Sequence, residues 1–227
     1  VFVSDASTAD DVSGYAGVRR SRILQTPQLL PPFTQKRRAP NSERQTLLWL
    51  VEPNAQHDLV NALEGLRIYQ AEGGTFDVIV AGEGAYAFDP IEGQLALADV
   101  PTRSRRPTTT MQFETISGEA DLQRVIARSD FIWSSALAQA ENDGLLRAAA
   151  AELPFIGLRY PQNEHLADNL GVPSVLYDRS EATLIADALA TAEQEGAPAL
   201  PRRSASTKDE SDGWRPLIES LWGGGIA

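Results

Sequence analysis

The chain has 227 residues, of which 42% are hydrophobic and 22% charged, so it can bury a substantial core and has the composition of an ordinary soluble domain. A formal net charge of -11 disfavours nucleic acid as a partner, because nucleic-acid binders concentrate Lys and Arg on one face. The absence of cysteine excludes disulfides, thiolate zinc sites and cysteine nucleophiles, and two histidines leave little room for a histidine metal cluster. We therefore expect no metal cofactor.

No apolar run reaches about eighteen residues, and no charged-then-apolar leader is present, so we expect no membrane span and a cytoplasmic location. The chain begins with Val rather than Met, and the pattern Val1–Ser4 indicates a strand already under way. This start suggests a fragment cut from a longer protein.

Short apolar runs alternate with helical patterns along the chain. The runs that indicate strands are 22–25, 46–51, 76–81, 110–113, 131–133, 155–158 and 174–177. Apolar residues at helical spacing occur in 59–69, 122–126, 145–149 and 184–189. Continuous rather than alternating apolarity is typical of strands that are covered on both faces. The alternation predicts an α/β domain with a doubly wound, mostly parallel Rossmann-like sheet and right-handed crossovers.

Two segments interrupt this alternation. Residues 91–109 hold Arg103, Arg105 and Arg106 without periodicity, which indicates a long surface loop, and 196–212 has the composition of a linker. Beyond the linker an apolar stripe at helical spacing predicts a C-terminal amphipathic helix, formed by Trp214, Leu217, Ile218, Leu221 and Trp222. We expect this stripe to cover a missing domain or the flank of this one, and to cause self-association if it is left bare.

Candidate ligand-binding residues follow the predicted strands. The loop after strand 131–133 leads into a helix, and the amides of Gly144 and Leu145 at the helix start could face an anion. Ser134 and Ser135 end that strand. Structural alternatives are a turn for the two serines and, for Glu141 and Asp143, carboxylates that simply favour the helix dipole.

The strand at 76–81 leads into Gly82, Glu83 and Gly84. Small residues at this point allow a ligand close to the main chain. The alternative for both glycines is a strand-to-loop turn with positive φ.

Laid end to end, these segments resemble the C-terminal, donor-binding domain of GT-B retaining glycosyltransferases of the glycogen-synthase-like, group 1 type. The resemblance covers about Thr46 to Ala192 and is carried by Leu47–Val51, Asp77–Gly84, Ala120–Ser135, Leu145–Leu158 and Glu164–Ala190. It implies that 1–45 is the end of an N-terminal domain with the interdomain connection, 46–195 the donor-binding domain, and 196–227 the linker and final helix.

The donor motifs of that family are degenerate here. The Arg and Lys that hold the donor's diphosphate correspond to Glu52 and His57. The two glutamates of the family correspond to Gln139 and Arg147, and a two-residue contraction instead makes Glu141 the first of them. Arginine has no acceptor for a ribose hydroxyl.

The resemblance implies Glu141 as the catalytic residue that contacts the donor sugar. It implies donor binding by Gly82, Glu83, Gly84, Ser134, Gly144, Leu145, His57 and Asn163.

Several of these residues also have structural interpretations. His57 would be a partly exposed residue at a helix start, Glu52 with Asn54 would cap the following helix, and Asn163 before Glu164 would be another cap. Arg147 would be a helix-surface charge paired with Glu141 or Asp143. We interpret His165 as structural.

The favoured hypothesis is the donor half of a glycosyltransferase, which moves a sugar from a nucleotide-diphosphate sugar to a glycan or other hydroxyl acceptor and is inactive without its other domain. The alternative is a catalytically silent glycosyltransferase-like module for binding or assembly. A third hypothesis, nucleotide-sugar epimerisation, lacks recognisable acid-base carboxylates in this sequence.

Overall fold

The computed structural model of the protein describes residues 2–3, 6–25, 30–37, 44–51, 56–83, 111–138 and 143–196. The chain divides into two compact units, one of residues 1–30 and 201–227 and one of residues 31–200. Several predicted features lie outside the described residues, namely Glu52, Asn54, Gly84, Gln139, Glu141, the arginines at 103–106 and the apolar stripe at 214–222.

The described part of the first unit is small. Its elements are β1 (Phe2–Val3), α1 (Ala6–Ala16), the 3-10 helix η1 (Arg20–Arg22) and β2 (Leu24–Gln25). The two strands pair in parallel, and Ala9 and Ile23 form a buried contact beneath them. The strand predicted over 22–25 starts only at Leu24, because Arg22 belongs to η1.

The second unit contains a six-stranded sheet in which every neighbouring pair is parallel. The strands, in spatial order, are β10 (Ser174–Tyr177), β9 (Phe155–Leu158), β7 (Phe131–Ser134), β3 (Thr46–Val51), β5 (Asp77–Glu83) and β6 (Met111–Ile116). The chain thus starts in the middle of the sheet, builds outward to β6, and returns to the other side of β3. The predicted doubly wound Rossmann-like sheet is confirmed.

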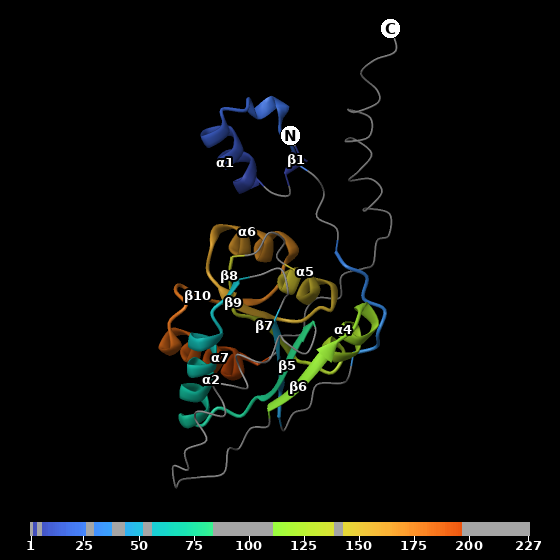
Figure 1. The fold of residues 1–227 in the computed structure, drawn as a ribbon, viewed down its shortest axis with the longest axis vertical. Helices are drawn as coiled ribbons and strands as arrows, with labels where there is room; N and C mark the ends of the chain where they lie inside the picture. The colour runs from blue at the N-terminus through green and yellow to red at the C-terminus, as the bar shows by residue number, and fades with distance from the viewer. Residues whose placement is uncertain are drawn as a thin grey trace. The chain divides into compact units, whose positions relative to one another are not determined.

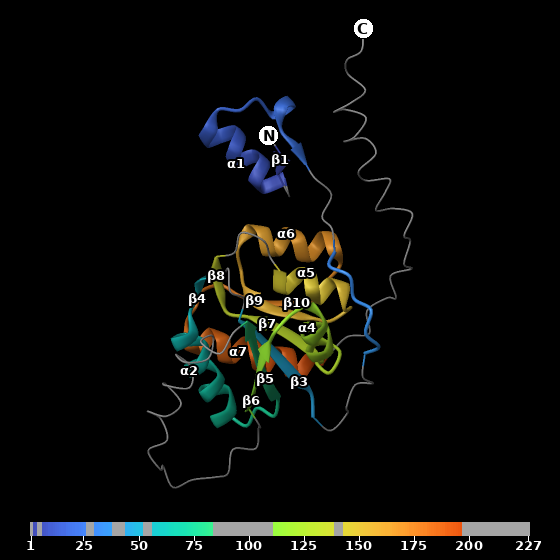
Figure 2. The same cartoon turned by 45° about the vertical axis from the view of Figure 1, so that its right-hand side comes forward.

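Helices cover both faces of this sheet (Figures 1 and 2). One face carries α2 (Leu59–Ala71) and α7 (Ala182–Glu195), which pack against each other. The opposite face carries α4 (Glu119–Ile126), α5 (Asp143–Ala150) and α6 (Pro161–Leu170). None of the helices in the described ranges has the length and hydropathy needed to cross a bilayer.

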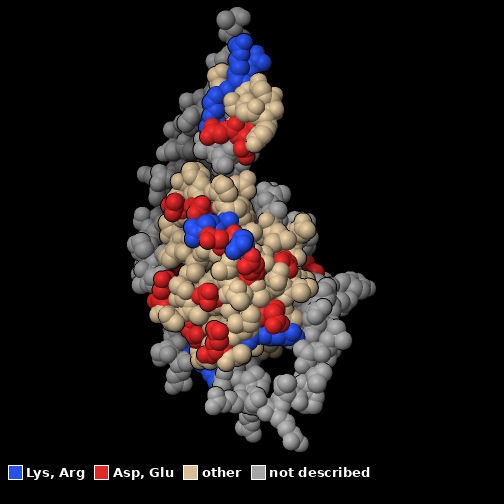
Figure 3. Space-filling view, turned by 90° about the vertical axis from the view of Figure 1, so that its left-hand side faces the viewer, with Lys and Arg blue, Asp and Glu red and all other residues tan. Residues whose placement is uncertain are grey.

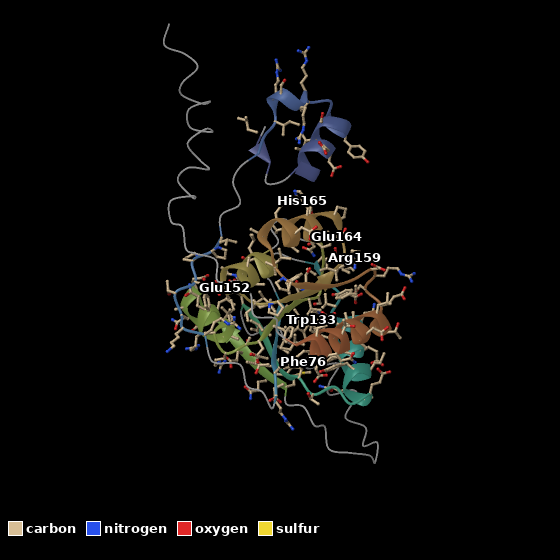
Figure 4. The ribbon with its side chains drawn as sticks, turned by 180° about the vertical axis from the view of Figure 1, so that it is seen from behind. Phe76, Trp133, Glu152, Arg159, Glu164 and His165 are labelled. Carbon is tan, nitrogen blue, oxygen red and sulfur yellow. The ribbon has the colours of Figure 1, made fainter. Side chains whose placement is uncertain are left out.

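The core between the sheet and the α2–α7 layer is aromatic. Trp49 of β3 and Trp133 of β7 stack with ring centroids 4.7 Å apart, and both are fully buried. Phe76 meets Phe131 edge to face at 5.2 Å. Figure 4 shows Trp133 and Phe76 deep inside the unit. Aromatic pairs of this kind contribute about 0.5–1.5 kcal/mol beyond their buried area.

Tyr69 joins the end of α2 to α7. Its hydroxyl donates to Glu193 Oε2 at 2.7 Å and accepts from the backbone N–H groups of Thr75 and Phe76 at 3.0 and 3.1 Å. Burial and the neighbouring Glu193 carboxylate raise the pKa of Tyr69 well above its ordinary value, so the phenol stays protonated. The turn it holds includes Gly73 at φ 103°, which terminates α2.

Residues 31–37 are held on the second unit by α4. The buried Gln123 side chain accepts from the Thr34 N–H at 3.2 Å and donates to the Pro32 carbonyl at 2.8 Å. Arg37 donates to the Glu152 carbonyl at 2.8 Å, next to the start of β9. The segment that leads into the sheet is therefore fixed before β3 begins.

Tyr69→Phe should lower the free energy of unfolding by about 1–3 kcal/mol, because the buried Phe76 N–H loses its acceptor and Glu193 loses the hydrogen bond from the phenol. Urea unfolding measures this difference. Tyr15→Phe is the matched control, since Tyr15 is 92% exposed and its hydroxyl is in water. Equal stability of the two variants would contradict the role given to Tyr69.

Candidate functional site

The strand order places one crevice where ligands of α/β proteins bind. The chain leaves β3 toward β5 on one side and β7 lies on the other, so the connections at the carboxyl ends of β3 and β7 diverge. In doubly wound sheets this switch point is where nucleotides bind. The candidate site therefore lies in the segments that follow Val51 and Ser134.

A buried hydroxyl stands at this point. Ser135, two residues beyond Trp133, is 2% exposed. Its Oγ accepts from Trp49 Nε1 at 3.0 Å and lies 3.0 Å from His57 Nδ1. Sequence reasoning assigned Ser135 to a turn and did not find its partners, because the residues involved are 78 and 86 positions apart.

His57 belongs to a short ribbon rather than to a helix. β4 (Gln56–His57) pairs antiparallel with β8 (Ala136–Ala138), with His57 opposite Ala136. The structure places His57 in β4, one residue before the Asp58 cap, half-buried, and not in the helix that was predicted. The ribbon joins the segments that follow β3 and β7, so His57 and Ser135 reach the same place.

Asp58 caps α2. Its Oδ1 accepts from the Asn61 N–H at 3.2 Å, and its Oδ2 accepts from Asn61 Nδ2 at 2.7 Å and from the Ser180 hydroxyl at 2.9 Å. Burial alone would raise the pKa of Asp58, but the hydrogen bonds from Asn61 and Ser180 outweigh it and lower the pKa below its ordinary value. The alternative that Glu52 and Asn54 cap this helix is wrong, since Asp58 holds the cap position.

The signal for this cap was present in the sequence. An aspartate immediately before the first apolar residue of a helical pattern is a typical start signal, and Asp58 precedes Leu59. In the first turn of α2 the Asn61 N–H thus already donates to the Asp58 carboxylate.

The start of α5 is also acidic. Asp143 is the first residue of the helix. Gly144 and Leu145 follow it in the first turn, and both are buried. Arg147 donates to Asp143 Oδ2 at 2.7 Å and to both carboxylate oxygens of Glu119 in α4 at 3.0 Å. The predicted pairing of Arg147 with Asp143 is confirmed.

Arg147 therefore bridges two helices. Its side chain is 15% exposed. Burial would lower its pKa, but the hydrogen bonds and charges of Asp143 and Glu119 outweigh that effect and raise it. The Arg147 guanidinium is thus paired with the carboxylates of Asp143 and Glu119.

A second ionic cluster lies beyond β9 and β10. Arg159 donates to Asp178 Oδ1 and to Glu164 Oε1, each at 2.7 Å. Arg159 and Glu164 are labelled in Figure 4, together with His165 of α6. Figure 3 shows basic atoms of the larger unit next to acidic ones. These pairs are exposed, so each contributes little to stability.

Asn163 is 4% exposed and lies in the first turn of α6. Its Nδ2 donates to the Leu158 carbonyl at 2.8 Å, while its Oδ1 is buried without a hydrogen-bond partner in the described part of the chain. The helix cap predicted here is wrong, because Tyr160 occupies the N-cap position.

The remaining predicted residues lie at the ends of β5 and β7. The positive φ predicted for Gly82 is wrong, because Gly82 is buried inside β5 and pairs with Val51 and Thr115. Glu83 is the exposed last residue of β5. Ser134 ends β7, and its carbonyl accepts from the Tyr177 hydroxyl at 3.3 Å.

A pocket of about 120 Å³ lies at the amino-terminal ends of the strands, opposite the switch point. Phe131, Phe155 and Ser174, which line it, are the first residues of β7, β9 and β10. None of the predicted site residues lines this pocket, so it is separate from the switch point.

Comparisons with solved structures identify the fold. WaaG, a glycosyltransferase involved in lipopolysaccharide biosynthesis, aligns over 98% of this chain and 62% of its own, with 20% identity and a TM-score of 0.58. An S. aureus TarM variant in complex with fondaparinux, α-GlcNAc-glycerol and UDP aligns over 96% of this chain and 43% of its own, with 12% identity and a TM-score of 0.58.

A chain in the structure of accessory secretory proteins 1, 2 and 3 of Streptococcus pneumoniae aligns over 97% of this chain and 41% of its own, with 13% identity and a TM-score of 0.55. No protein-family model and no curated protein sequence matches the chain. The protein thus has the Rossmann-like fold found in GT-B glycosyltransferases, and it spans less than two thirds of each of these neighbours.

Asp58→Asn should lower the free energy of unfolding at neutral pH by about 1 kcal/mol, because the charge-assisted cap is lost. The pKa of Asp58 is lower in the folded chain than in the unfolded chain, where it is about 3.9. The stabilisation by the Asp58 carboxylate is therefore present above that unfolded pKa and is lost as the pH falls through the folded pKa. Urea unfolding at neutral and at acidic pH measures the size of this stabilisation and its loss. Asp168→Asn on the exposed surface of α6 is the control. A pH-independent difference would contradict the assignment.

Proposed function

We propose that the chain is the donor-binding half of a glycosyltransferase that takes a sugar from a nucleotide-diphosphate sugar. The observation that carries the proposal is the switch point between β3 and β7, where His57 and Ser135 meet. The fold neighbours include named glycosyltransferases, and one of them was solved with UDP.

In this proposal the diphosphate lies against neutral donors. The amides of Gly144 and Leu145 at the α5 start and the ring of His57 supply hydrogen bonds to it. Binding needs no metal cofactor. The acceptor site belongs to a second domain, so we expect no turnover by this chain alone.

Calorimetric titration with UDP, GDP and their sugars, with and without Mg²⁺, tests the proposal. Binding tighter than about millimolar, roughly 4 kcal/mol, supports a donor site. Complete absence of binding would favour the second candidate function.

The second candidate is a catalytically silent module that binds or assembles with another protein. The observation in its favour is charge: α2, α5 and α6 each have a carboxylate in the cap or first turn, from Asp58, Asp143 and Glu164. These carboxylates oppose a diphosphate, and Arg147 and Arg159 are held in ion pairs.

Asp143→Asn tests whether the start of α5 faces the diphosphate. If the α5 start faces the diphosphate, removing this carboxylate and loosening Arg147 should tighten UDP binding about threefold, because a nearby like charge is lost. Glu152→Gln, at the amino edge of the sheet, is the control and should leave the affinity unchanged. An unchanged affinity in Asp143→Asn would place the nucleotide elsewhere.

A further inference from the structure

The hydroxyl of Ser135 has two partners among the residues that the structure describes. Trp49 Nε1 and His57 Nδ1 each lie 3.0 Å from Ser135 Oγ. Ser135 is 2% exposed and both rings approach from fixed backbone, since Trp49 is paired in β3 and His57 in β4. The three groups form one chain of hydrogen bonds, which is buried at Trp49 and Ser135 and half-buried at His57.

Counting donors and acceptors decides where each proton lies. A hydroxyl offers one hydrogen and two lone pairs, and an indole N–H can only donate. Trp49 therefore occupies a lone pair of Ser135 Oγ. The hydroxyl hydrogen then has one acceptor among the described groups in reach, which is His57 Nδ1.

The opposite arrangement leaves a buried donor unsatisfied. If His57 carried its proton on Nδ1, both Trp49 and His57 would donate to Ser135 Oγ, and the hydroxyl hydrogen would face no acceptor among the described residues. Buried polar hydrogens without an acceptor are rare and costly. The network therefore selects the tautomer with a bare Nδ1.

We propose that Ser135, anchored by Trp49, is a positioning residue that fixes neutral His57 with its proton on Nε2. Whatever Nε2 contacts, it contacts as a donor. This step rests on the proposed function: the preoriented, neutral ring of His57 donates a hydrogen bond to a phosphate oxygen at the switch point. A neutral ring of fixed orientation then binds the phosphate in place of a positively charged side chain.

Nitrogen NMR of the ¹⁵N-histidine-labelled full chain tests the tautomer directly. The chain has only two histidines, and His165→Gln removes one signal, which assigns the other to His57. At about pH 8, where an ordinary histidine is neutral, we expect a protonated Nε2 and an unprotonated Nδ1. The reverse pattern would overturn the proposal.

Two variants test whether Ser135 is the cause. Ser135→Ala removes the hydroxyl and should give a mixture of tautomers, whereas Ser135→Thr keeps a hydroxyl and should retain the Nε2–H form. An identical His57 signal in Ser135→Ala and in the parent chain would show that Ser135 does not fix the tautomer. If Ser135→Ala does not fold, the spectra of the parent chain and of Ser135→Thr still decide the tautomer.

UDP affinity supplies the second measurement. Loss of the fixed donor in Ser135→Ala should weaken UDP binding about three- to tenfold, and Ser135→Thr should restore it. Unchanged affinity in Ser135→Ala, with its tautomer mixed, would refute the role toward phosphate. If the parent chain binds no UDP but shows the Nε2–H tautomer, the proposed function fails and the assignment of Ser135 stands.

Discussion

The arrangement of the larger unit depends on the central position of β3. Because β3 pairs in parallel with both β5 and β7, its side chains are covered on both faces and its carboxyl end faces a divergence of the chain. The indole of Trp49 stacks on Trp133, and its buried N–H donates to the Ser135 hydroxyl. This hydrogen bond links the central strand to the candidate site.

Charge distribution at the switch point differs from that of a typical anion site. Helix N-termini attract anions through unpaired N–H groups and the helix dipole. Here Asp58 accepts from the first turn of α2, and Arg147 of α5 pairs with Asp143 of the same helix and with Glu119 of α4. A ligand at this place would be recognised by hydrogen-bond geometry more than by net attraction.

The sequence was sufficient for the fold and for much of the element pattern. Apolar runs at 46–51, 155–158 and 174–177 coincide with β3, β9 and β10, because fully covered strands need continuous apolar residues. The end of α2 is also local in origin, because Gly73 follows it with a φ of 103°, which glycine adopts readily.

Contacts that join distant parts of the chain could not be predicted in this way. The links between Trp49, Ser135 and His57, and the link from Asp58 to Ser180, follow from strand order and register and not from local spacing. A turn was one of the two interpretations of Gly82, yet β5 continues to Glu83 through pairing with β3 and β6. A cap was one of the two interpretations of Asn163, because its residue type favours that position, but Tyr160 is the N-cap residue of α6.

The stacked indoles of Trp49 and Trp133 also give the larger unit an optical property. Their rings lie in contact beneath the residues that would meet a ligand, and Trp49 is joined to Ser135 by a hydrogen bond. Indole emission depends on the polarity around the ring and its N–H. If a ligand binds at the switch point as proposed, we expect it to change the emission of Trp49.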